Sequence, residues 1–165
     1  MKKHLGLVQV LLAGICFGFL GIFARFAYQN QITLGTLLTF RFALAAIILW
    51  TILLIFRPKL ITLDRKHLIS SALLGVFGYA VFSTLYFESI KGMSVPLASM
   101  ILFTFPIFVN LGAHFFLKEK LSRGQVSGLC IGSIGLILLL WGNISVEKTS
   151  AIFYGLGAAI SYSIY

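Results

Sequence analysis

Long apolar runs separated by short basic clusters are the feature that most restricts what this chain can fold into. A bilayer core of about 30 Å is crossed by about 20 apolar helical residues. Five runs reach that length, at roughly 5–28, 33–56, 68–90, 95–117 and 124–142. A sixth run, 151–165, would rise only about 22 Å as a helix. The pattern therefore predicts an all-α integral membrane protein with five complete transmembrane helices and a truncated sixth.

The composition excludes an ordinary soluble domain. The chain is 59% hydrophobic and 10% charged, whereas soluble domains are about 25% charged. The formal charge of +9 could suggest nucleic-acid binding, but the basic residues lie in short clusters between apolar runs and not on a polar face. We therefore expect the lipid bilayer as a partner and no nucleic acid.

The basic clusters also predict the orientation in the membrane. Nine Lys and Arg residues precede the first run, separate the second from the third, or separate the fourth from the fifth, and only Lys91 and Lys148 lie on the other side. Because cytoplasmic loops carry the excess of Lys and Arg, the N-terminus is expected in the cytoplasm. The predicted location is the cell (inner or plasma) membrane, crossed several times.

Three charged residues lie inside the runs, toward the predicted outer side: Arg25, Arg41 and Glu88. An arginine at the centre of a membrane helix costs at least about 2.5–3.5 kcal/mol, so each charge should face protein or water. Glu88 is a candidate partner for either arginine, and it could also pair locally with Lys91, three residues on. The main interpretation is an internal salt bridge or a snorkelling side chain, and attraction of a substrate is the alternative.

Two runs carry semi-polar stripes at helical spacing. Asn and His would not face lipid, so these stripes should face protein or a cavity. Pro106 removes the hydrogen bond to the carbonyl of Leu102 and should kink its helix. We predict that the stripes line a substrate cavity, with plain packing as the alternative. Their members are Tyr79, Ser83 and Tyr86 in the third run, and Ser99, Phe103, Pro106, Asn110 and His114 in the fourth.

Glycines recur on one face of the first and fifth runs. Small residues at such spacing let helix backbones approach closely in lipid. We interpret them as helix-packing positions, and faces that slide during transport are the alternative. They are Gly14, Gly18 and Gly21, and Gly128, Gly132 and Gly135. The two cysteines, Cys16 and Cys130, lie in apolar runs without a metal-binding spacing, so we expect packed thiols and no metal.

A weak internal repeat relates the start of the sixth run to the first. Residues 14–18 and 159–163 share the order small, Ile, small, aromatic, small. A repeated unit of five helices would be inverted in the membrane, which is a recurrent transporter plan with the binding site at the repeat interface. This predicts a five-helix repeat at 1–142, an outer loop at 143–149 and the start of a second repeat at 150–165, so that the chain is a fragment.

The region around the fourth run resembles the EamA family of the drug/metabolite transporter superfamily. The likeness rests on Pro106, on the turn from Phe116 to Ser122, on Gln125, and on the glycines of the next helix. The family typically shows a proline in this helix and an apolar-small-Glu-basic-Leu-Ser/Thr turn. Lys118 stands where a small residue, often glycine, is usual. The resemblance covers residues 1–142 and, as a beginning, 150–165.

The resemblance implies a ten-helix secondary transporter with both termini in the cytoplasm. Such a protein would move a small solute (a metabolite, an amino acid or a drug-like compound), usually outward, by alternating access and without a cofactor or covalent chemistry. Its remaining partner would be a second repeat or a second copy of the chain. Two readings stay open beside it: a small non-transporting membrane scaffold, and a half-size transporter that acts as a dimer. None of them is an enzyme.

Overall fold

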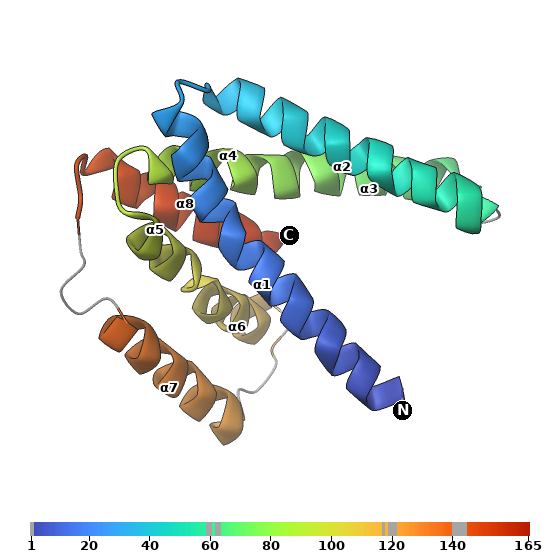
Figure 1. Cartoon of the computed structure of the whole chain (residues 1–165). Coiled ribbons are helices and arrows are strands. Elements are labelled where there is room, and N and C mark those ends of the chain that lie inside the picture. Colours follow the sequence, from blue (N-terminus) through green and yellow to red (C-terminus); the bar gives the residue numbers. More distant parts are fainter. Residues whose placement is uncertain (1, 59–60, 62–63, 117, 119–121, 140–144) are drawn as a thin grey trace.

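The computed structural model describes residues 2–58, 61, 64–116, 118, 122–139 and 145–165, and every named element in it is a helix (Figure 1). Two helices precede the basic loop around residue 60, and a third crossing follows it in three joined segments. The elements are α1 (Lys2–Gln29), α2 (Leu34–Phe56), α3 (Arg65–Leu73), the π-helical segment η2 (Leu74–Ala80), α4 (Val81–Ile90), α5 (Val95–Leu102), α6 (Phe105–Phe116), α7 (Arg123–Leu139) and α8 (Ser150–Ile164).

Four stretches are long and apolar enough to span a membrane: Gly6–Gln29, Leu34–Phe56, Arg65–Ile90 and Val95–Phe116. The all-helical fold is therefore confirmed, and four of the predicted crossings have helices of the required length and apolar composition. The described part of α7 has 17 residues, and the predicted end of its run at 142 lies outside the described residues. The fifth complete crossing and the inverted repeat stay predictions.

Lipid, and not water, is the solvent that the outer helix surfaces fit. In α2 only Leu38 is buried, although the helix is almost entirely apolar. Large side chains such as Ile47, Trp50 and Ile55 are about half to two-thirds exposed. Exposed apolar surface of that extent marks a membrane or partner interface.

The fourth run is broken in the middle, as Pro106 predicted. The helix ends at Leu102 and begins again at Phe105. Proline has no N–H to give to the carbonyl of Leu102, and the chain turns more tightly there, with Thr104 N–H donating to Ile101 O at 3.1 Å. Both segments contact α8, but α5 also contacts α1 and α4, whereas α6 lines a groove with α7.

The 15-residue helix α8 lies in the middle of the bundle, against α4, α5, α6 and η2 (Figure 1). Its contact face is built from small buried residues, Ala151, Gly155, Ala158 and Ala159. A Cβ added at Gly155 would lie 3.1 Å from Ile101 Cγ2. Small residues at this spacing let the backbones come close, so the run interpreted as a truncated crossing forms part of the core.

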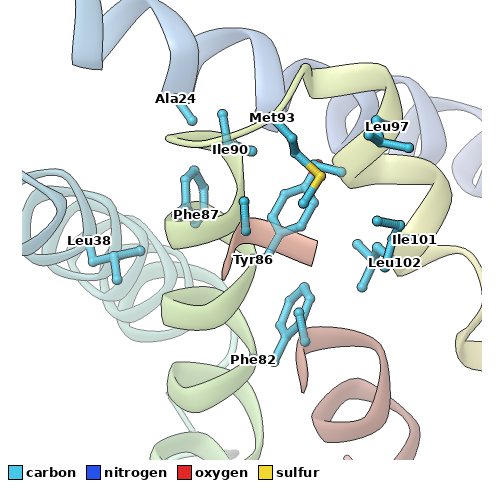
Figure 2. Packing of buried hydrophobic residues seen from close by; sticks show 13 residues of the cluster. Ala24, Leu38, Phe82, Tyr86, Phe87, Ile90, Met93, Leu97, Ile101 and Leu102 are labelled. Atoms are coloured by element: carbon cyan, nitrogen blue, oxygen red, sulfur yellow. The ribbon is translucent and has the colours of Figure 1, made fainter. Parts of the chain in front are cut away.

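Figure 2 shows the centre of this core, where side chains of α4 meet the turn after it and α5. Phe82, Ile90 and Met93 are at most 1% exposed. Ala24 of α1 and Leu38 of α2 join the same cluster. The core thus gathers residues from helices that are distant in sequence and fixes the polar side chains that lie among them.

The segment before α8 is bound to the turn between α4 and α5. Ser94 N–H donates to Ser145 O at 3.0 Å, and Glu147 N–H donates to Gly92 O at 2.9 Å. Met93 and Val146 form an isolated antiparallel bridge. We call residues 91–94 and 145–148 the paired loops. They hold the start of α8 beside the end of α4.

Candidate functional site

Seven of the eight predicted cavity residues lie in two places, and the eighth, His114, lies in neither. The upstream group, from Tyr79 to Ser99, lies near the core contacts of α4, α5 and α8. Phe103, Pro106 and Asn110 instead line a groove between α6 and α7. The break at Phe103–Thr104 separates the two groups, because it ends the regular helical spacing on which the single stripe was based.

A partly buried polar pair joins the two predicted stripes. Tyr86 Oη and Ser99 Oγ lie 3.0 Å apart, within hydrogen-bond distance. Tyr86 is 3% exposed and Ser83, one turn before it, is fully buried. Ser83 Oγ has no hydrogen-bond partner among the described residues. Polar groups in a membrane core normally mark functional positions or helix contacts, so this pair and Ser83 are the inner candidate site.

Two tyrosines, Tyr162 in α8 and Tyr165 directly after it, pack against aromatic rings that include Phe82 and Tyr79. The ring of Tyr162 lies 4.6 Å from that of Phe82 and 4.8 Å from that of Phe105. Tyr165 lies 5.7 Å from Tyr79. Sequence reasoning missed both tyrosines. Their spacing of three residues on a helix with a small-residue face was the signal that could have indicated them.

Arg41 reaches this aromatic cluster from α2. Its Nη2 donates to Tyr79 Oη at 2.5 Å. The guanidinium carbon lies 5.7, 5.5 and 5.2 Å from the ring centroids of Phe42, Tyr79 and Phe87, distances typical of cation–π contacts. Arg41 therefore faces protein, and its partners in the described part of the chain are a phenol and aromatic rings and not a carboxylate.

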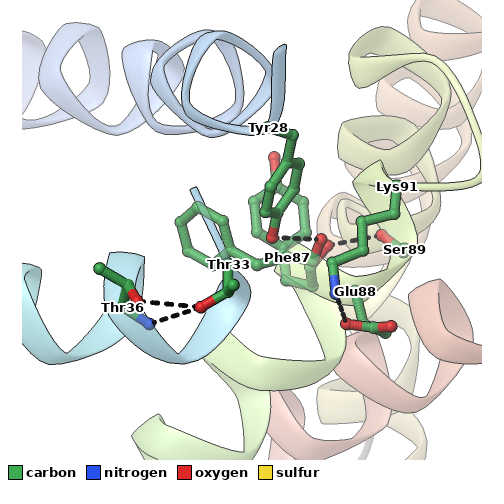
Figure 3. A network of polar contacts seen from close by, with 8 residues as sticks. Tyr28, Thr33, Thr36, Phe87, Glu88, Ser89 and Lys91 are labelled. Carbon is green, nitrogen blue, oxygen red and sulfur yellow. Dashed lines mark hydrogen bonds and ion pairs between the residues drawn. The ribbon is translucent and has the colours of Figure 1, made fainter. Parts of the chain in front are cut away.

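Glu88 pairs with neither intramembrane arginine, so that expectation was wrong, and the local alternative is confirmed. Lys91 Nζ lies 2.6 Å from Glu88 Oε2 (Figure 3). A lysine three residues away needs no tertiary approach, which is why the local pair forms. The same lysine lies 5.5 Å from the ring centroid of Tyr28.

Arg25 instead pairs with Glu147 of the paired loops. Arg25 Nη2 lies 3.4 Å from Glu147 Oε1, and its Nη1 donates to Ile90 O at 3.4 Å. Both side chains are substantially exposed, at 41% and 57%, so the pair adds little stability. A shallow pocket of about 360 Å³ lies among these charges and Tyr28.

The groove between α6 and α7 has a volume of about 580 Å³. Asn110 Nδ2 donates to Pro106 O at 2.7 Å, so the amide partly closes on its own helix. Gly128 and Gly132 form part of the opposite wall. His114 is exposed near the end of α6, with its ring 5.4 Å from that of Phe115.

The six predicted packing glycines differ in their surroundings. A Cβ at Gly21 would lie 2.4 Å from Val95 Cγ1 and 3.2 Å from Tyr86 Oη, so α1 approaches α5 closely there. At the other five no described atom lies within 4 Å of an added Cβ, and their packing role stays a prediction. These five are Gly14, Gly18, Gly128, Gly132 and Gly135.

Long apolar helices with hydroxyls and an arginine between them define a multi-pass membrane protein with a partly polar interior. Such an interior is what a protein that handles polar molecules within the bilayer requires. The chain belongs to the EamA-like transporter family, whose profile matches residues 4–141. The family and its transporter relatives do not suggest an enzyme.

Relatives in two bacteria carry the same description. The uncharacterized transporter YyaM of Bacillus subtilis is 30% identical over 116 residues, which are 70% of this chain and 38% of the relative. YoaV of the same organism is 31% identical over 133 residues, 75% of this chain and 43% of the relative. An uncharacterized transporter of Helicobacter pylori is 23% identical over 159 residues, 96% of this chain and 53% of the relative.

The chain thus spans about half the length, or less, of the curated relatives it matches. No solved structure matches it significantly.

Proposed function

We propose that this chain is part of a secondary transporter that moves a small solute across the cell membrane by alternating access. The family and the transporter relatives support the permease class. Export is the direction that the resemblance to the family implies. The solute is a metabolite, an amino acid or a drug-like compound, and the N-terminus lies in the cytoplasm.

One observation carries the proposal: the hydroxyls of Tyr86 and Ser99 lie 3.0 Å apart, one helical turn from the buried Ser83, in a bundle whose outer surface is apolar. A scaffold that only packs in lipid has no need for these groups, because apolar side chains would fill the same space without a desolvation cost. A solute path does need them, since a polar molecule must exchange water for protein partners on its way through.

A complete path requires more protein than these helices. The relatives extend well beyond the matched part, and the groove between α6 and α7 is lined by Asn110 and Gln125 as well as by apolar residues. We propose that residues 1–142 form one five-helix repeat, that 150–165 begin an inverted second one, and that the rest of the path comes from that repeat. A second copy of the chain is the alternative source.

Thiol accessibility tests the path. Single cysteines at Ser99, Pro106 and Asn110, in a background with Cys16 and Cys130 replaced by serine, should react with a membrane-impermeant maleimide. A cysteine at Ile47, on the exposed face of α2, is the matched control and should stay unreactive, because lipid holds its thiol protonated and away from water. Inert thiols at all three test positions would contradict the path and favour a packed scaffold.

A further inference from the structure

We infer that Arg41 and Tyr79 bind an anionic group, a carboxylate or a phosphate, of the solute. This inference rests on the proposed transport function and names the chemical class of its substrate. It starts from the observation that Arg41 is a cation inside the membrane whose partners in this structure do not balance its charge.

The position of Arg41 makes an unbalanced charge costly. It lies seven residues after the start of α2 at Leu34, which is about 11 Å along the helix axis. At that depth a cation needs an anion, a polar cavity or an escape to the interface. Arg41 does not escape, because its guanidinium lies against Tyr79 and the ring of Phe87, on the protein side of α2.

The acidic residues of the chain either pair with cations other than Arg41 or lie on the predicted cytoplasmic side of the membrane. The sequence has four of them. Glu88 pairs with Lys91, and Glu147 pairs with Arg25. Asp64 directly precedes α3, in the loop predicted to be cytoplasmic. Glu119 lies outside the described residues, in the other basic cluster on that side. Among the described residues, Arg41 therefore has no carboxylate partner.

One terminal nitrogen of the guanidinium lacks a hydrogen-bond partner among the described residues. Nη2 donates to Tyr79 Oη, whereas Nη1 is buried and has no hydrogen-bond partner in the described part of the chain. A guanidinium presents its N–H groups as a planar fork that matches two oxygens of a carboxylate or phosphate. An oxyanion is thus the ligand that would satisfy both the charge and the unpaired donor.

The π-helical backbone around Tyr79 is a second, independent indication of a binding site. Tyr79 lies within η2, the π-helical segment Leu74–Ala80, and π-helical turns occur frequently at functional sites. The extra residue in the turn changes the direction of the side chains that follow it, and here Tyr79 Oη meets Arg41. The rings of Phe42 and Phe87 supply apolar walls beside the cation.

Metabolite export by intact cells tests the inference. Cells carrying the wild-type gene, Arg41→Gln or Arg41→Lys are compared by mass spectrometry of the medium, with an empty vector as the baseline. Arg57→Gln is the matched control, since it removes an exposed cation directly after the same helix. Membrane abundance and thermal unfolding of each variant are measured in parallel.

We expect every solute whose export depends on the wild-type chain to carry an anionic group at neutral pH. Arg41→Gln should lower that export by about tenfold or more, because a charged hydrogen-bonded pair is lost. Arg41→Lys keeps the positive charge but not the two N–H groups that bind two oxygens, so it should lower export several-fold at normal membrane abundance. This variant tests the inference even if Arg41→Gln fails to fold. Arg57→Gln should stay within about twofold of wild type.

Three results would overturn the inference. The exported solutes could be neutral or cationic, the Arg41→Lys variant could export anions as wild type does, or export of solutes of every charge could fall together. The last result would assign Arg41 a structural anion, such as a lipid phosphate or an acidic side chain of a second repeat. No export above the vector in any strain would instead contradict the proposed transport function itself.

Discussion

In the described part of the chain, two residues other than glycine, Gln31 and Lys118, have a positive φ angle. After α1, Gln31 has a φ of 64°, and Ile32 N–H donates to Ala27 O at 3.0 Å while Gln31 N–H donates to Tyr28 O at 3.1 Å. This is the Schellman arrangement, in which glycine is the usual residue at the left-handed position. Lys118 has a φ of 56°, which explains why the family resemblance implies a small residue there.

Gln31→Gly should therefore stabilise the protein. The left-handed conformation costs a residue with a Cβ about 1–2 kcal/mol. Glycine removes this cost, but it also raises the conformational entropy of the unfolded chain, which offsets part of the stabilisation. We expect a net increase of about 1 kcal/mol in the free energy of unfolding, measured by thermal unfolding in detergent. Gln29→Gly, inside α1, is the control and should destabilise; a parallel loss in both variants would contradict this account.

The amino-acid sequence could predict some contacts of the candidate site. The Glu88–Lys91 ion pair could be predicted because the two residues are three apart in sequence. The partner of Arg25 was not, because Glu147 lies 122 residues away and its approach depends on the paired loops. Likewise, nothing in the local sequence marks Leu74–Ala80 as π-helical, so the meeting of Tyr79 with Arg41 could only come from the structure.

At the scale of elements, the close approach of α1 to α5 depends on Gly21. Gly21→Ala would place a methyl group 2.4 Å from Val95 Cγ1, and overpacking of this kind typically costs about 1–3 kcal/mol. Gly18→Ala is the matched control on the same helix, since its Cβ would meet nothing within 4 Å. Thermal unfolding of the two variants should separate them, and equal stabilities would show that α1 is not held at Gly21.

The elements also show why the sequence predicts helices better than their contacts. The length of the apolar runs alone predicted four helices that are long enough to span the membrane, because the thickness of the bilayer sets the length that a helix needs. The two polar stripes were expected to line a substrate cavity, but Phe103 and Asn110 line the groove beside α7, whereas Ser99 contacts Tyr86. A proline predicts a kink and not its direction, since the direction depends on tertiary packing.

The whole molecule has a predicted orientation that reporter fusions can test. Alkaline phosphatase fused after Gly92, in the paired loops, should be active, because that loop is expected outside the cytoplasm and the enzyme needs an oxidising compartment. A fusion after Pro58, in the basic loop that follows α2, should be inactive. The reverse activities would overturn the orientation, and with it the assignment of Arg41 to the outer half of the membrane.

The central position of α8 bears on the order in which the protein is made. The described helices that α8 contacts are all synthesised before it, so α4, α5 and α6 enter the membrane before α8 can pack against them. The ring of Phe82 meets Tyr162 only after residue 162 has left the ribosome. Biosynthesis therefore passes through a stage in which these helices are inserted but still lack their contacts with α8.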